Sequence, residues 1–257
     1  MPDSLKVFIT GASSGIGAAL AAHYAARGSI LGLCARRVEP MRELLARQRC
    51  GGACYTVDVT ESRSMQNAAR DFVERFGAPD IVIANAGISV GTSSGLPEDL
   101  ATFRRVMDTN VFGMAATFQP FIDPMRKGAG GTLVGIASVA GFRGLPGAAA
   151  YSASKSAAIT YLESLRVELY GSGISVVTIC PGYVRSPMTA VNRYRMPFII
   201  SAEEAARRIA RAVAQERRMA VIPWQMALAS HVLRVLPGWL YDRVFARAPR
   251  KARSLLQ

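Results

Sequence analysis

Short apolar runs alternate with longer amphipathic stretches over the first 180 residues, and this alternation constrains the fold more than any other feature. The runs are rich in Val, Ile, Leu and Ala without regular polar alternation, as expected of strands buried on both faces. Alternating strands and helices predict an α/β fold with a doubly wound parallel sheet and helices on both faces. The predicted strands are 6–10, 30–34, 53–57, 81–84, 132–136 and 174–179, and the predicted helices are 16–26, 38–49, 63–76, 99–119 and 150–169.

The pattern changes after residue 180. An irregular stretch runs to about residue 200, and a helix is then predicted from Ser201 to about Arg217. Ser201 is the expected N-cap, and Glu203 and Glu204 stand in the first turn, where carboxylates complement the helix dipole. A short strand is predicted at 220–222.

The chain has 257 residues without an internal repeat or a Pro/Gly/Ser-rich linker, so a single domain is expected. Residues 1–223 are expected to hold the sheet, and residues 224–257 form a basic, partly apolar tail. The tail carries Trp224, Trp239 and Tyr241 with several arginines nearby. This composition suits a pocket cover, an oligomer contact or a membrane-surface segment, and the sequence leaves the three open.

Charge and cysteine usage exclude several classes of protein. The net charge of +13 is concentrated after residue 184, which favours an acidic partner (anionic lipid, an acidic carrier protein) or simply a solvated arginine-rich face. Without a recognition motif, no nucleic-acid partner is expected. Four Cys and two His predict neither a disulfide framework nor a metal site. Since there is no signal peptide or long apolar run, a cytoplasmic protein is expected, with peripheral membrane contact left open for the tail.

A glycine-rich turn follows the first predicted strand and opens the first helix. The turn reads Thr-Gly-Ala-Ser-Ser-Gly-Ile-Gly over residues 10–17, without the Lys-Ser/Thr of a triphosphatase phosphate loop. Glycines at such a turn let the backbone approach a pyrophosphate, and the helix N-terminus favours its charge. The sequence therefore predicts a dinucleotide site that includes Gly11, Ser13, Ser14, Gly15, Ile16 and Gly17.

The end of the second strand distinguishes NADPH from NADH. An acidic residue is expected there when the 2′-hydroxyl of NAD is bound, but this chain has Arg36 and Arg37. Guanidinium groups suit a 2′-phosphate, so NADP(H) is the predicted cofactor. Arg37 could instead be a surface charge at the start of a helix.

Further motifs follow in order: Asn85-Ala86-Gly87 after the fourth strand, Ser138 after the fifth, Tyr151-x-x-x-Lys155 on the next helix and Pro181-Gly182 after the sixth strand. With the glycine-rich turn, this ordered set resembles the short-chain dehydrogenase/reductase family over about residues 5–223. The resemblance implies a three-layer, Rossmann-type NAD(P)-binding catalytic domain that assembles as a homodimer or homotetramer. One departure concerns the turn after the sixth strand, where the family usually has a threonine and this chain offers Ser186, or Thr189 shifted along the chain. The further cofactor-binding residues implied are Asp58 and Val59 at the adenine, then Asn85, Ala86, Gly87, Pro181, Gly182, Val184 and Ser186, with Tyr151 and Lys155.

The catalytic set implied by the resemblance is Asn110, Ser138, Tyr151 and Lys155. Tyr151 and Lys155 are four residues apart on a predicted helix, so their side chains share one face. A nearby ammonium and an oxidised nicotinamide would lower the phenol pKa from its usual value near 10. Ser138 could hydrogen-bond the substrate oxygen, and by resemblance Lys155 holds the nicotinamide ribose while Asn110 orders a water.

The predicted activity is NADPH-dependent hydride transfer between the nicotinamide and a carbonyl or secondary alcohol, with Tyr151 as general acid or base. The stretch 188–200 is largely apolar, which favours a lipophilic small-molecule substrate. Reduction of 3-oxoacyl groups on an acidic carrier protein is an alternative, because basic residues cluster late in the chain. A non-catalytic NADP-binding regulator is a third, although it would have no need for Ser138, Tyr151 and Lys155 together.

Overall fold

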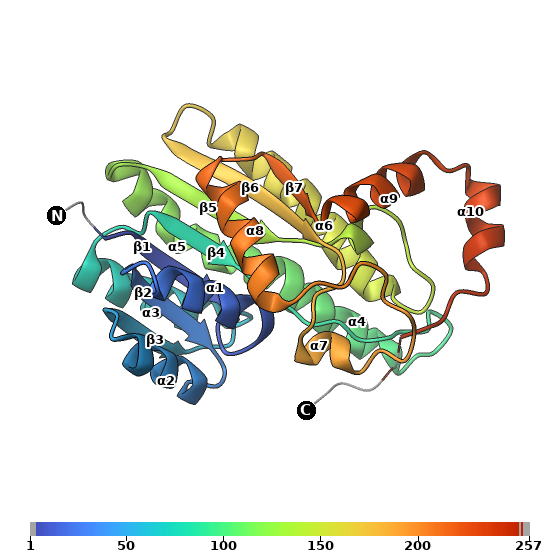
Figure 1. Cartoon of the computed structure of the whole chain (residues 1–257), viewed down its shortest axis with the longest axis horizontal. Helices are drawn as coiled ribbons and strands as arrows, with labels where there is room; N and C mark the ends of the chain where they lie inside the picture. The colour runs from blue at the N-terminus through green and yellow to red at the C-terminus, as the bar shows by residue number, and fades with distance from the viewer. Residues whose placement is uncertain (1–3, 252, 254–257) are drawn as a thin grey trace.

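The described residues of the computed structural model, 4–251 and 253, form a seven-stranded parallel sheet in the order β3-β2-β1-β4-β5-β6-β7 (Figure 1). The α/β, doubly wound, single-domain fold predicted from the sequence is confirmed. The predicted strands are correct within two residues at each end. The strands are β1 (Lys6–Thr10), β2 (Ile30–Ala35), β3 (Gly52–Thr56), β4 (Ile81–Ala84), β5 (Gly131–Ile136), β6 (Ile174–Pro181) and β7 (Met219–Ile222).

Helices cover both faces of the sheet, which makes three layers (Figure 1). One face packs against α1 (Gly15–Ala25), α2 (Glu39–Gln48) and α8 (Ala202–Ala214). The other packs against α3 (Ser62–Phe76), α5 (Gly113–Lys127) and α6 (Ala149–Glu168). The remaining helices are α4 (Asp99–Met107), α7 (Pro187–Ala190), α9 (Trp224–Val235) and α10 (Gly238–Phe245), with a π-helical turn η1 (Asp108–Phe112) and a 3₁₀ turn η2 (Val139–Gly141).

Strand β1 shows why the apolar runs lack polar alternation. Successive side chains of a strand point to opposite faces of the sheet. Val7 and Ile9 belong to the cluster under α1, α2 and α8, whereas Phe8 lies in the cluster under α3 and α5. The Phe8 ring centroid lies 5.4 Å from that of Phe72 and 4.7 Å from that of Phe121. Both faces are therefore core, and a polar residue at any of these positions would be buried.

The predicted helix at 99–119 differs from the structure in length and regularity. It begins at Asp99 as expected, passes through the π-helical turn η1, and continues as α5 to Lys127. Pro120 and Pro124 lie inside α5 without ending it. A π-helical turn places one extra residue in a turn and is frequent at functional sites. Asn110 lies within it.

The C-terminal third agrees with the prediction up to β7 and then adds structure that was not predicted. Ser201 caps α8, since its hydroxyl accepts a hydrogen bond from the Glu204 N–H at 3.1 Å. The helix ends at Ala214, three residues before the predicted end at Arg217. Helices α9 and α10 follow β7 and extend from one side of the molecule, after which the chain returns toward α4 (Figure 1).

Two further observations concern the whole described chain. All four cysteines are free thiols. Across residues 4–251 and 253, no helix combines the length and the apolar character needed to span a bilayer.

Candidate active site

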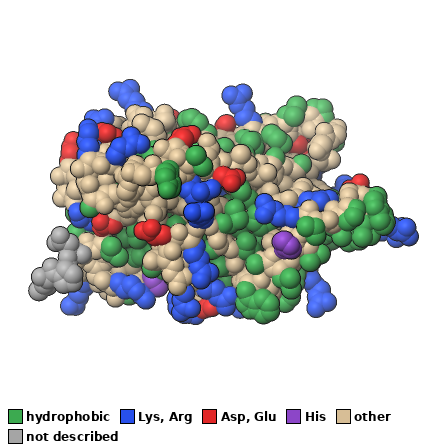
Figure 2. Space-filling view, turned by 90° about the horizontal axis from the view of Figure 1, so that it is seen from above, with side chains coloured by type: hydrophobic (Ala, Val, Ile, Leu, Met, Phe, Trp, Pro, Cys, Tyr) green, Lys and Arg blue, Asp and Glu red, His purple; other side chains and the backbone are tan. Residues whose placement is uncertain are grey.

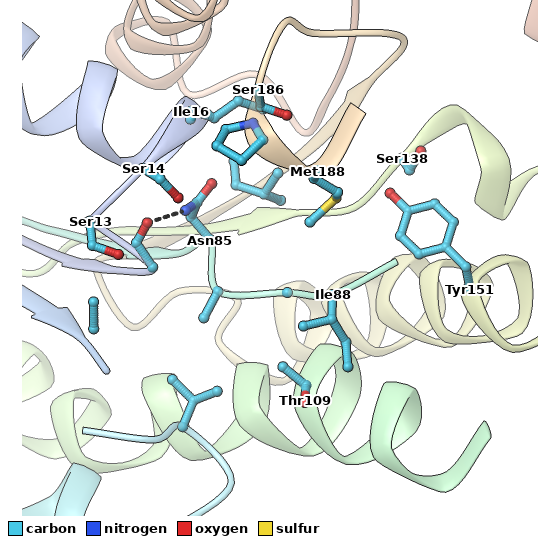
Figure 3. Close-up of a pocket in the computed structure, with 18 of the residues that line it drawn as sticks. Ser13, Ser14, Ile16, Asn85, Ile88, Thr109, Ser138, Tyr151, Ser186 and Met188 are labelled. Carbon is cyan, nitrogen blue, oxygen red and sulfur yellow. Dashed lines mark hydrogen bonds between the residues drawn. The ribbon is translucent and has the colours of Figure 1, made fainter. Parts of the chain in front are cut away.

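A cleft of about 1170 Å³ opens at the carboxyl ends of the strands, where the strand order reverses between β1 and β4. Ligands of open α/β sheets bind at such a switch point. Most of the residues predicted from the sequence meet here, although they come from the ends of β1 to β6 and from helix α6 (Figure 3). They are Gly11, Ser13, Ser14, Gly15, Ile16, Arg36, Arg37, Asp58, Val59, Asn85, Ala86, Gly87, Ser138, Tyr151, Lys155, Pro181, Gly182, Val184 and Ser186. Gly17 and Asn110 do not line the cleft.

The glycine-rich turn has the geometry of a phosphate cradle. Gly11 and Gly15 have φ values of +67° and +56°, which favour glycine. A Cβ on Gly11 would lie 2.8 Å from the Ala86 Cα, and one on Gly17 would collide with the Gly11 carbonyl oxygen. Helix α1 therefore packs directly on the turn, and its N-terminus points at the cleft. Ser14, the N-cap residue, makes no side-chain capping bond, so the first amides of α1 can bind an anion.

Asn85 locks this turn to the end of β4. Its Nδ2 donates to the carbonyl oxygens of Thr10 at 3.1 Å and Gly11 at 3.2 Å (Figure 3). The Thr10 hydroxyl in turn accepts hydrogen bonds from the backbone N–H groups of Asn85 at 3.2 Å and Ala86 at 3.3 Å. Four hydrogen bonds thus hold the cradle before any ligand binds. The residues present fit the pyrophosphate of a dinucleotide.

Positive charge gathers at the far end of the cleft around Asp58. Burial favours the neutral form of Asp58, but hydrogen bonds from the Thr60 N–H at 3.0 Å and hydroxyl at 2.8 Å oppose it. Together with the charges of Arg36 and Arg105, they hold the Asp58 pKa below its usual value. The exposed guanidinium of Arg36 therefore lies near the Asp58 carboxylate, which already accepts two hydrogen bonds from Thr60.

Tyr151 and Lys155 are one helical turn apart on α6. Ser138 faces Tyr151 from the end of β5 (Figure 3). The Lys155 Nζ donates to the carbonyl oxygen of Ile136 at 2.7 Å and lies 5.9 Å from the centroid of the Tyr151 ring. The Ser138 hydroxyl accepts from the Ala140 N–H at 3.2 Å. Ser138 and Lys155 are buried, at 7% and 5% exposure, so both act where water is largely excluded.

The pKa values of this group differ from the expectation. Burial raises the pKa of the Tyr151 phenol above its usual value, and a hydrogen bond with Ser138 opposes that rise only in part. Lys155 is not among the groups that lower it. Burial also lowers the pKa of Lys155 to about 8, and the Cys180 thiol opposes that shift. Burial is thus the largest influence on the Tyr151 pKa within the chain itself, and the expected acidification by Lys155 together with an oxidised nicotinamide stays a prediction.

Asn110 lies behind the cleft, only 1% exposed, in the π-helical turn. Its amide binds the backbone of Ile88, and its Nδ2 also donates to the Ser154 hydroxyl at 2.9 Å. A Cβ on Gly87 would lie 3.0 Å from the Asn110 Oδ1 and 3.7 Å from the Lys155 Nζ. Asn110 thus holds the segment Gly87–Ile88, which follows β4 and passes beside Lys155. Its expected role in ordering a water stays a prediction.

Ser186 and Thr189 are the two hydroxyl residues that follow β6, and the Thr189 hydroxyl is hydrogen-bonded within the turn itself. The Thr189 Oγ1 donates to the Val184 carbonyl at 2.7 Å and accepts from the Ser186 N–H at 3.1 Å. Both residues line the cleft, and Ser186 is the better candidate for a ligand contact. Of the expected apolar stretch, Met188 lines the cleft, whereas Ile200 packs on the core.

Some lining residues were not predicted. The sequence does carry a pattern for four of them. Ala101, Arg104, Arg105 and Asp108 have the spacing of one face of a single helix, so they would be expected to line the same surface. No comparable pattern marks the others. The lining residues that sequence reasoning missed are Ala35, Val57, Thr60, Ile88, Ala101, Arg104, Arg105, Asp108, Thr109, Ile136, Ala137 and Pro187.

The tail packs against the loop between β5 and α6. The Arg143 Nη1 donates to the Leu236 carbonyl at 3.1 Å, and its guanidinium carbon lies 4.3 Å from the Tyr241 ring centroid. The Tyr241 hydroxyl donates to the Gly144 carbonyl at 2.5 Å. One side of the tail therefore covers its own domain next to Tyr151.

Comparisons with known proteins agree with this geometry. Residues 6–196 match the family model described as short chain dehydrogenase. An uncharacterized oxidoreductase of Myxococcus xanthus is 37% identical over 93% of this chain and 95% of its own length. An alcohol dehydrogenase from Thermococcus sibiricus, solved with 5-hydroxy-NADP, is 25% identical with a TM-score of 0.76, covering 86% of this chain and 96% of its own. A 3-ketoacyl-ACP reductase from Sinorhizobium meliloti is 27% identical with a TM-score of 0.74, covering 84% and 96%.

Proposed function

Because the chain belongs to the short-chain dehydrogenase family and is an NAD(P)-dependent oxidoreductase, we propose that it uses NADPH to reduce the carbonyl of a lipophilic small molecule. The observation that carries the proposal is the meeting of Tyr151, Ser138 and Lys155 in the cleft that the glycine-rich turn opens. A cofactor-binding regulator would not need this set. In this proposal the domain 1–223 carries the chemistry, and the described part of the tail, residues 224–251 and 253, covers one side of it.

The proposed cofactor residues divide the cleft into three parts. Gly11, Ser13, Ser14, Gly15 and Ile16 would hold the pyrophosphate, with Gly17 behind them allowing α1 to pack on the turn, and Asn85, Ala86 and Gly87 would hold the adjoining ribose. Asp58 and Val59 would contact the adenine, and Arg36, with Arg37 beside it, the 2′-phosphate. Pro181, Gly182, Val184 and Ser186 would bind the carboxamide end. NADPH, when bound, supplies the hydride.

The chain's own residues would handle the proton. Ser138 would hydrogen-bond the substrate oxygen as charge develops on it, and Tyr151 would donate its proton to that oxygen. A raised phenol pKa keeps Tyr151 protonated at neutral pH, which suits the reductive direction. Lys155 would hold the ribose and stabilise the phenolate left behind.

The NADP preference is supported by the arginines at the end of β2 and by the Thermococcus enzyme, which was solved with an NADP derivative. The lipophilic substrate is supported by Met188 in the cleft wall and by the T-shaped pair of Tyr183 and Tyr194, whose ring centroids lie 6.4 Å apart. Tyr183 stands in the chain between Gly182 and Val184, which both line the cleft.

A second candidate is reduction of 3-oxoacyl groups on an acidic carrier protein. The ketoacyl reductase among the structural neighbours favours it, as do exposed arginines such as Arg207 on α8. We test the two by following NADPH absorbance with free lipophilic ketones and with 3-oxoacyl-carrier thioesters. Faster turnover of the free ketones supports the first candidate, and turnover of the carrier thioesters alone supports the second. No NADPH oxidation with either class would overturn both.

We also propose that the chain assembles as a homodimer or homotetramer. The outer side of the tail is apolar and exposed, with Trp224 at 68%, Leu228 at 62% and Trp239 at 70% exposure. Figure 2 shows these helices at one end of the molecule, where hydrophobic side chains gather beside Lys and Arg. A second copy of this chain would cover that surface. Contact with an anionic membrane surface is the alternative.

A further inference from the structure

The chain returns to the active site after α10 and crosses its outer side. We call residues 246–251 and 253 the C-terminal strap. At one point Arg250 packs on Gly147, where a Cβ would lie 2.8 Å from the Arg250 Cβ. At a second point the Arg253 guanidinium donates two hydrogen bonds to the Asp99 carboxylate, from Nε to Oδ2 at 3.0 Å and from Nη2 to Oδ1 at 3.1 Å. The strap is thus fixed at both the β5–α6 loop and the start of α4 (Figure 1).

Between these anchors, Lys251 reaches the catalytic phenol. Its Nζ donates to the Ser89 hydroxyl at 2.7 Å and lies 5.9 Å from the centroid of the Tyr151 ring. The Lys155 Nζ lies at the same distance from that centroid. Tyr151 therefore has two ammonium groups beside it, one from α6 and one from the strap.

The Lys251 ammonium has no anionic partner among the described residues. No carboxylate of residues 4–251 and 253 lies within salt-bridge distance of it, and the nearby Asp99 and Glu98 are paired with Arg253 instead. Burial alone lowers the Lys251 pKa to about 8, so the group remains largely charged at neutral pH. An ammonium has three donors, and Ser89 takes one. A partly buried cation of this kind is stabilised when an anion binds to it.

We propose that Lys251 is a specificity-determining residue that binds a carboxylate of the substrate, so that the enzyme acts on oxo acids with an apolar chain or ring. This inference rests on the proposed reductase function and names its substrate class. The carboxylate would bind the Lys251 ammonium and the carbonyl would reach Tyr151. The apolar part would then lie against Met188 in the cleft wall.

Matched pairs of substrates test the proposal. The purified enzyme with NADPH is given 4-oxopentanoate, 6-oxoheptanoate, 8-oxononanoate and 4-acetylbenzoate, each beside its methyl ester. A charge-assisted hydrogen bond contributes about 1.5–3 kcal/mol, which corresponds to roughly 10- to 100-fold in kcat/KM. We expect the acid to exceed its ester by that factor at one chain length or more, and Lys251→Met to remove the difference. Arg247→Met removes the same charge from an exposed position of the strap and should leave the preference intact.

Equal kcat/KM for every acid and its ester in the unmodified enzyme would overturn the proposal, as would a preference that survives Lys251→Met. Calorimetric titration of the NADP⁺-loaded protein with 4-acetylbenzoate gives a readout that needs no turnover. We expect at least about tenfold weaker binding in Lys251→Met. If the esters are reduced without any preference for acids, the carboxylate site fails and the reductase function stands. If Lys251-dependent binding occurs without reduction of any carbonyl, the reductase function fails and the site stands.

Discussion

The side chain of Asn110 pairs with the backbone of Ile88 through two hydrogen bonds. The Ile88 N–H donates to the Asn110 Oδ1 at 2.8 Å, and the Asn110 Nδ2 donates to the Ile88 carbonyl at 2.9 Å. Ile88 lines the cleft, and its backbone has no strand neighbour to satisfy it. The π-helical turn therefore fixes one wall of the site through a residue that does not reach the cleft.

Asn110→Ala should lower the free energy of unfolding by about 2 kcal/mol, because it leaves both backbone groups of Ile88 without their partners. Urea unfolding followed by circular dichroism measures the loss. Thr109→Ala, which removes one hydrogen bond to the Arg105 carbonyl on the same turn, is the control and should cost less. Equal costs for the two variants would contradict the supporting role of Asn110.

Arg36→Asp should shift cofactor preference toward NADH. The variant removes the guanidinium proposed to bind the 2′-phosphate and adds a repelling charge. The ratio of kcat/KM for NADPH to that for NADH should fall by roughly 10- to 100-fold. Arg70→Asp, at an exposed position of α3, makes the same change of charge away from the cleft. A ratio that stays constant in Arg36→Asp, or an unmodified enzyme that prefers NADH, would contradict the NADP assignment.

The reduction rate should fall as pH rises through about 8. Burial lowers the Lys155 pKa to about 8, so its ammonium is present below that pH and lost above it. The raised pKa of Tyr151 keeps the phenol protonated over the same range and cannot account for the fall. The measurement is kcat for carbonyl reduction between pH 6 and pH 10 at saturating NADPH. A flat profile to pH 10 would show that the Lys155 charge is not needed.

The apolar outer side of the tail should form a contact between copies of this chain. Light scattering should give a mass of two or four chains, and Leu228→Glu should reduce it, because the charge would be buried in the contact. Val167→Glu adds the same charge at a 63% exposed residue of α6, outside the tail, and should leave the mass unchanged. A monomer that sediments with anionic vesicles at low salt would instead assign this surface to a membrane.

Much of the fold and cleft could be predicted because the relevant constraints are local. Runs such as Lys6–Thr10 are apolar on both faces, which suits a covered parallel sheet, and residues just after the strands must gather at one edge. Gly11, Asn85 and Ser138 follow different strands and meet in one cleft for that reason.

The strap and the pKa values depend on contacts between distant parts of the chain. Lys251 lies beside Tyr151 on a segment that Arg253 holds to Asp99, and no periodicity in the sequence marks that pair. The direction of the Tyr151 pKa shift depends on how deeply the phenol is buried. Helical spacing places Lys155 beside Tyr151 but does not give that burial.

The central claim is that the Tyr151 hydroxyl transfers the proton during reduction, and Tyr151→Phe tests it most directly because only that oxygen is removed. Turnover of the best carbonyl substrate is measured beside NADPH binding, followed by the change in nucleotide fluorescence. The account predicts that turnover is lost while NADPH binds with nearly unchanged affinity. A variant that binds NADPH and keeps substantial turnover would contradict it.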